Sequence, residues 1–143
     1  MKYYDYFFYR IYKSINVTNK SIPEWSTIIV ISVLLTMNFI SAALFFELKI
    51  EKIGGYGFKA IPLTFIALNY MYFLFKDRYK CIIKTFNNTK YKKSIFYDLL
   101  ILSYYIVSVF VYFHFLGIEY TYSLALVFVV ILTSLYGYIR SKE

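Results

Sequence analysis

The chain has 143 residues, of which 60% are hydrophobic, 24% aromatic and only 17% charged, and its formal net charge is +8. A typical soluble domain is roughly 45–50% apolar and about 25% charged, and one small core cannot cover this much apolar surface. These values exclude a soluble monomer, and they exclude a disordered chain, which would be poor in aromatic residues. The single cysteine excludes an internal disulfide framework. We therefore expect an all-α integral membrane protein.

Residues 1–20 are predicted to form an amphipathic helix, because apolar side chains recur there at helical spacing. The helix should lie in the interface of the cytoplasmic leaflet, where tyrosine rings are favoured. The alternative is a helix packed on the bundle or on another subunit. The apolar face holds Tyr4, Phe7, Phe8, Ile11 and Ile15, and the opposite face holds Lys2, Asp5, Tyr9 and Lys13.

A four-helix transmembrane domain is predicted over 21–143, with spans at about 25–46, 58–76, 94–117 and 120–139. A spanning helix needs about 20 mainly apolar residues. The second uncharged stretch, 60–75, is shorter, and it reaches across if Lys59 and Lys76 extend their ammonium groups outward. Ser21 and Glu24 fit a capping box at the start of the first span, with Pro23 in its first turn.

The orientation follows from the lysines and arginines. With four spans, thirteen of the sixteen basic residues fall on the side that holds both termini and the second loop. The positive-inside rule places that side in the cytoplasm, and the expected location is a bacterial inner membrane. A three-span alternative would turn the N-terminus outward, but it would leave the apolar residues 60–75 in water.

The loop at 76–93 carries the strongest charge in the chain, with a single acid, Asp77. We expect it to set the topology and to contact anionic lipid at the cytoplasmic face. The alternative is an acidic partner; a nucleic acid is not expected. The second helix should continue into this loop as an amphipathic extension that ends at 87–88. The basic residues are Lys76, Arg78, Lys80, Lys84, Lys90, Lys92 and Lys93.

Polar residues at membrane depth are candidates for helix packing or for a pore. Asn38 and Asn69 fall near the middle of the first two spans, at similar depth, where they could bond to each other. In the third span, Asp98, Tyr105, Ser108 and Tyr112 share one stripe, and His114 lies on a neighbouring one. Packing is favoured for the two asparagines over a pore, and the stripes fit a bundle interior or equally a subunit interface. Asp98 should be stabilised by the helix dipole and by Lys92 or Lys93, with a proton or ion site as the alternative. His114 should be hydrogen-bonded at the interface, with pH sensing as the alternative.

The sequence contains no recognisable catalytic, cofactor or metal motif. One histidine and one cysteine cannot build an ordinary zinc or haem site, and no nucleophile elbow or Walker motif is present. We expect no enzyme activity and no cofactor. The enzymatic alternative would be a lipid-modifying reaction at Asp98 or His114.

The segment 4–13, with four apolar spans after it, resembles small uncharacterised membrane proteins of Bacteroidota. That group implies a layout and no activity. We expect a non-enzymatic protein that acts by oligomerisation, as a channel, a membrane-perturbing effector or a membrane sensor, for example in phage defence. The alternative is a scaffold or accessory subunit of a larger membrane complex, with a membrane or cytoplasmic protein as partner.

Overall fold

The computed structural model describes residues 2–48, 54–88 and 95–117, together with residues 121, 122, 124, 125 and 128. The side chains at 2, 18, 54–58, 95, 96 and 98 are outside the described set. Five α-helices and no strand occur in this part of the chain, which confirms the predicted all-α class. The predicted fourth span, 120–139, lies largely outside the described residues.

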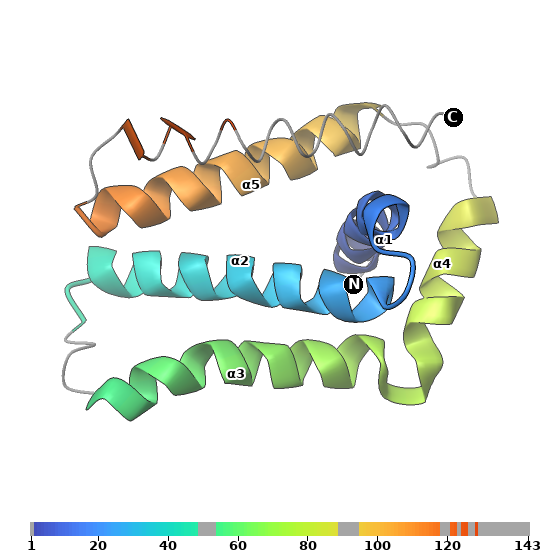
Figure 1. The fold of residues 1–143 in the computed structure, drawn as a ribbon, viewed down its shortest axis with the longest axis horizontal. Coiled ribbons are helices and arrows are strands. Elements are labelled where there is room, and N and C mark those ends of the chain that lie inside the picture. Colours follow the sequence, from blue (N-terminus) through green and yellow to red (C-terminus); the bar gives the residue numbers. More distant parts are fainter. Residues whose placement is uncertain are drawn as a thin grey trace.

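Three long helices form a row with α2 at its centre (Figure 1). They are α2 (Pro23–Phe45), α3 (Gly54–Phe73) and α5 (Ile95–Phe115). On one side of α2, the rings of Trp25 and Tyr70 lie 5.2 Å apart, and on the other side the rings of Phe45 and Phe115 lie 6.1 Å apart. By length and composition, α2 is the one described helix that suffices to cross a membrane.

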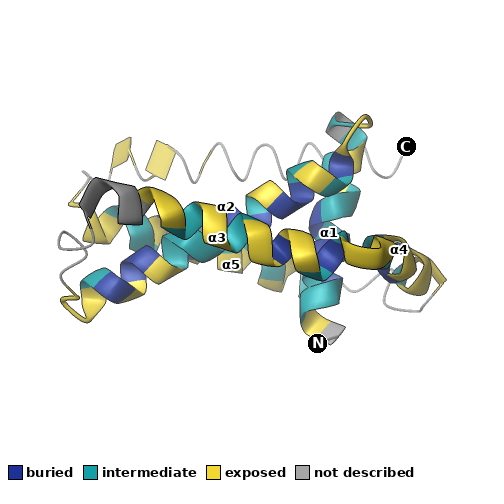
Figure 2. Cartoon of the chain, turned by 90° about the horizontal axis from the view of Figure 1, so that it is seen from below, coloured by how far each residue is buried: buried dark blue, intermediate teal, exposed yellow. Residues whose placement is uncertain are grey.

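Two helices lie crosswise at one end of this row. α1 (Lys2–Thr18) crosses the long helices between α2 and α5, and α4 (Arg78–Asn88) lies across the end of the bundle (Figures 1 and 2). Figure 2 shows α1 mostly intermediate or buried and α4 largely exposed. The end that holds α1 and α4 is also the end where α2 begins and α3 stops.

The start of α2 differs from the predicted capping box. The N-cap residue is Ile22, which makes no side-chain cap bond, and Pro23 occupies the first turn, where a missing N–H costs nothing. Ser21 instead donates its backbone N–H to the side chain of Asn19. Farther along, Thr27 and Ser41 donate to carbonyls four residues earlier, and this satisfies hydroxyls on an apolar helix.

The second long helix does not continue into the basic loop as predicted. α3 ends at Phe73, and a short 3-10 turn, η2 (Phe75–Asp77), redirects the chain into α4. Lys76 and Asp77 have φ values of 55° and 56°, in the left-handed region that L-residues avoid. The prediction was wrong because α4 is held by tertiary contacts that helical periodicity does not reveal. α4 ends at Asn88.

The main core gathers around α1. Phe8 is fully buried, and the Tyr9 side chain, predicted on the polar face of this helix, is only 2% exposed. That face assignment was wrong because α4 covers the side of α1 that would otherwise meet water. The buried cluster consists of Tyr6, Phe8, Tyr9 and Ile11 of α1 with Ile28, Ile31, Phe73 and Ile82.

Candidate functional site

Two polar clusters lie where α1 meets the other helices, and we call this region the α1 junction. The first cluster is centred on Asn69 of α3. Its side chain is 3% exposed. Tyr4 of α1 donates its hydroxyl to Asn69 Oδ1. Asn69 Nδ2 in turn donates to Ser32 Oγ of α2 and to the Phe65 carbonyl, both at 2.9 Å. One amide therefore ties three helices together and leaves neither of its ends unsatisfied.

The second cluster holds the ion pair between Asp5 and Arg78. Arg78 Nη2 lies 3.3 Å from Asp5 Oδ2 and donates at 2.8 Å to the Tyr72 hydroxyl. Tyr72 donates to Asp5 Oδ1 at 3.1 Å, and the guanidinium carbon lies 4.0 Å from the centre of the Tyr72 ring. Arg78, the first residue of α4, thus connects α4 to α1 and to α3 at the same point.

Aromatic rings fill the space between the two clusters and α4. Phe8 stacks on Phe73 of α3 with the ring centres 4.2 Å apart. On α4, Phe86 meets the ring of Tyr6 at 5.4 Å and the ring of Tyr9 at 5.5 Å. The Tyr9 hydroxyl donates to Asn87 Oδ1 at 3.0 Å. These contacts fix α1 by its rings and by its hydroxyl groups.

The phenols of Tyr4, Tyr6 and Tyr9 on α1 are neutral across the physiological range. Burial raises the pKa of Tyr4 to about 12. Burial also raises the pKa of Tyr6 and that of Tyr9. Removal from water disfavours the phenolate, so none of these groups serves as a base near neutral pH.

The two asparagines predicted at similar depth do not bond to each other. Asn38 donates from Nδ2 to the hydroxyl of Tyr104 on α5, whereas Asn69 has the partners described above. The suggested pairing was wrong because the two amides lie on different sides of α2: α3 with Tyr4 covers one, and α5 covers the other.

The predicted polar stripe of the third span is distributed along α5 and does not converge on one point. Tyr105 packs beside Phe7 of α1, with the ring centres 6.2 Å apart. Ser108 is 2% exposed, Tyr112 is half-buried, and His114 is exposed beside Phe115. The Asp98 side chain lies outside the described part. No group of three or more potential metal ligands occurs among the described residues.

The basic loop is divided by the fold. Lys76, Lys80 and Lys84 are exposed, whereas Arg78 is engaged by Asp5 and Tyr72. Lys80 also pairs with Asp77 at 3.1 Å, on the surface, where such a pair contributes little. Lys90, Lys92 and Lys93 lie outside the described residues.

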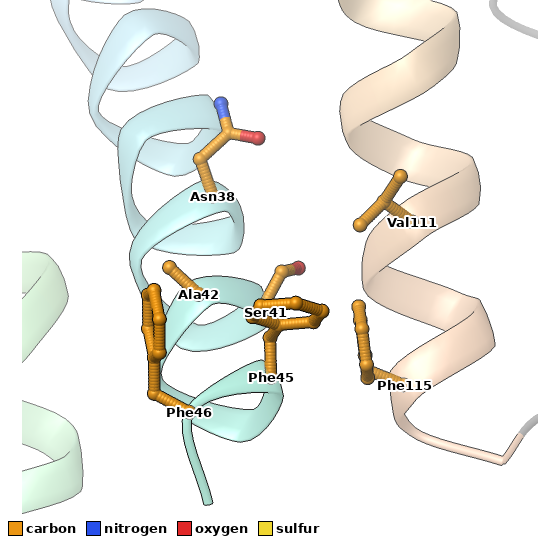
Figure 3. Close-up of a pocket in the computed structure, with 7 residues that line it drawn as sticks. All are labelled: Asn38, Ser41, Ala42, Phe45, Phe46, Val111 and Phe115. Carbon is orange, nitrogen blue, oxygen red and sulfur yellow. The ribbon is translucent and has the colours of Figure 1, made fainter. Parts of the chain in front are cut away.

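A cavity of about 290 Å³ lies between α2 and α5, at the end away from α1 (Figure 3). Its wall is mostly apolar, and the Ser41 hydroxyl donates a hydrogen bond to the Met37 carbonyl. Such a site can hold an apolar group but offers no nucleophile or acid–base pair. The lining residues are Asn38, Ser41, Ala42, Phe45, Phe46, Val111 and Phe115.

Sequence reasoning missed four members of the α1 junction. Tyr4 was placed on an apolar face and Asp5 on a solvated one, and Ser32 and Tyr72 were not singled out. The sequence signal was the phenol of Tyr4 on the otherwise apolar face of residues 1–20, because a buried phenol needs a hydrogen-bond partner.

No protein-family model, no curated protein and no solved structure matches this chain.

Proposed function

We propose that the protein is a four-span, non-enzymatic membrane protein of the bacterial cytoplasmic membrane that works by assembling with copies of itself. The observation that carries this proposal is the exposure of α2. In the most apolar 18-residue stretch of α2, only 39% is buried inside the protein, whereas a core helix of a soluble protein would be mostly buried.

The neighbouring helices support a lipid environment. Large apolar side chains point outward from α2, α3 and α5 along most of their length, and water would oppose so much exposed apolar surface. Hydrocarbon accepts it without cost. These exposed residues include Ile29, Val33, Phe39, Leu63, Leu68, Met71, Leu99 and Val107.

The crosswise end supports the orientation with both termini in the cytoplasm. α4 presents Lys80 and Lys84 on its exposed face, and Ile82 on its buried face. Basic residues next to spans favour the cytoplasmic side. There Lys76 and Lys84 contact anionic headgroups, each contributing about 1 kcal/mol near the surface.

Assembly is supported by a polar pair at mid-depth between α2 and α5, which is open to the surroundings. Asn38 and Tyr104 hydrogen-bond at an exposed position, and this is the one hydrogen bond of the amide within the described part of the chain. Polar groups in hydrocarbon favour contact with another helix. A second copy that covers this pair would build the oligomer on which a channel, a membrane-perturbing effector or a membrane sensor of phage defence depends.

The test is the native mass of the full chain in mild detergent, combined with dye leakage from liposomes. We expect a homo-oligomer, and Asn38→Leu should shift the mass towards the monomer. Thr64→Val is the matched control, because the Thr64 hydroxyl is exposed yet bonds to the Ala60 carbonyl of its own helix. A monomer at every concentration would overturn the assembly proposal, and an oligomer without leakage would remove the channel version.

The second candidate is an accessory subunit, and the exposed face of α4 favours it. Lys80, Cys81, Lys84 and Thr85 form one polar face turned away from the core, as a docking helix would. A stoichiometric foreign protein in the same mass measurement would support this candidate in place of self-assembly.

A further inference from the structure

α1 contacts α4 at both of its ends. At the first residue of α4, Arg78 pairs with Asp5 at 3.3 Å. In the last turn, Asn87 accepts a hydrogen bond from Tyr9 at 3.0 Å. Asp5 and Tyr9 are four residues apart and so lie on the same side of α1. A single helix face therefore contacts both ends of α4.

The turn that α1 holds in place is unfavourable in itself. Lys76 and Asp77 adopt left-handed backbone angles one after the other, and neither is a glycine. Such residues persist where the surrounding structure over-determines them. Arg78 follows directly and is fixed to α1 by Asp5 and to α3 by Tyr72. The contacts of α1 thus oppose the relaxation of the turn.

We propose that α1 is a clamp that keeps α4 across the end of the bundle, and that opening the Asp5–Arg78 contact lets α4 swing out at the η2 turn. The basic face of α4 would then point in a different direction when the contact is open than when it is closed. The Asp5 side chain is 17% exposed and that of Arg78 is 39% exposed, so a competing charged group can reach the contact from outside. This inference does not depend on the proposed assembly.

The experiment measures the distance between α3 and α4 in the full-length protein in detergent micelles. Cys81 is the only cysteine and is exposed on α4, so one nitroxide label attaches there. A second label goes on Ala67→Cys, at an exposed position of α3. Pulsed electron–electron double resonance should give one narrow distance distribution in the doubly labelled parent protein. Asp5→Asn should shift and broaden that distribution.

Asp77→Asn is the matched control. It makes the same chemical change one residue from Arg78 and breaks the exposed pair with Lys80, but it leaves α1 untouched, and asparagine tolerates the left-handed region. We expect its distance distribution to equal that of the parent. Tyr9→Phe removes only the hydroxyl bond at the far end of α4 and should broaden the distribution in the same direction as Asp5→Asn.

A pair of labels at Val33→Cys and Leu63→Cys, in a Cys81→Ser background, reports on the α2–α3 row. It should not move in Asp5→Asn. If the α2–α3 distance does change in Asp5→Asn, that variant disturbs the bundle itself. The α3–α4 distance in Tyr9→Phe then tests the clamp in its place. The clamp is overturned if neither Asp5→Asn nor Tyr9→Phe changes the α3–α4 distance, or if Asp77→Asn changes it equally.

Discussion

Asn69 is the residue on which the contact of α1 with the long helices depends most. Its amide accepts from Tyr4 and donates to Ser32 and to a backbone carbonyl, and the residue is 3% exposed. Removal of one partner from a buried hydrogen bond leaves the other unsatisfied, which costs more than the bond itself contributes.

We therefore expect Asn69→Leu to destabilise the protein by about 1–3 kcal/mol, because Tyr4 and Ser32 both lose their partner. Tyr4→Phe removes one bond and keeps the ring, and should cost about 1 kcal/mol. Thermal unfolding in mild detergent, followed by circular dichroism, checks both values. Equal melting midpoints for Asn69→Leu and the parent protein would show that the hydrogen bonds of Asn69 do not stabilise the fold.

The raised pKa of Tyr4, about 12, makes a second prediction at this scale. The folded state favours the protonated phenol more than the unfolded state does, so the associated stability is present below about pH 10. It is lost as the pH rises through the folded pKa. Absorbance at 295 nm should show a late step that is smaller by one phenol in Tyr4→Phe, since burial also raises the pKa of Tyr6 and that of Tyr9. A complete titration by pH 11 would contradict a buried Tyr4.

The turn between α3 and α4 can be tested at the scale of the element. Lys76 has a φ of 55°, and glycine enters that region without the steric cost that other residues meet. Lys76→Gly should stabilise the protein by about 1 kcal/mol. Lys84→Gly, the same change inside α4, should destabilise it by roughly 0.5–1 kcal/mol. Melting midpoints that move in the same direction would refute the left-handed turn.

The long helices could be anticipated from the sequence because charged residues delimit them. The apolar run at 25–46 lies almost wholly within α2, between Glu24 and Glu47. The crosswise position of α4 could not be anticipated from the sequence, because it depends on the pairing of Arg78 with Asp5, 73 positions earlier. Tyr9 shows the same limit: periodicity identifies the two faces of a helix, but not whether both are covered.

At the scale of the whole molecule, the native Cys81 tests the proposed topology. A membrane-impermeant maleimide should label Cys81 in inside-out vesicles and not in intact spheroplasts, because the proposed topology puts α4 on the cytoplasmic side. Glu47→Cys in a Cys81→Ser background should give the opposite pattern, since Glu47 is exposed just beyond the other end of α2. Labelling of Cys81 from outside would invert the orientation.

The placement of α1 also has a consequence for biosynthesis. The side chains that hydrogen-bond to Tyr4, Asp5 and Tyr9 lie 65 to 78 residues farther along the chain, from Asn69 to Asn87. At about 5–20 residues per second, the ribosome needs roughly 4–16 s to produce them after α1 itself. During that time α1 has no complete docking site, and its aromatic face must wait at the membrane surface or on a chaperone. α1 therefore reaches its final place only after α3 and α4 have been made.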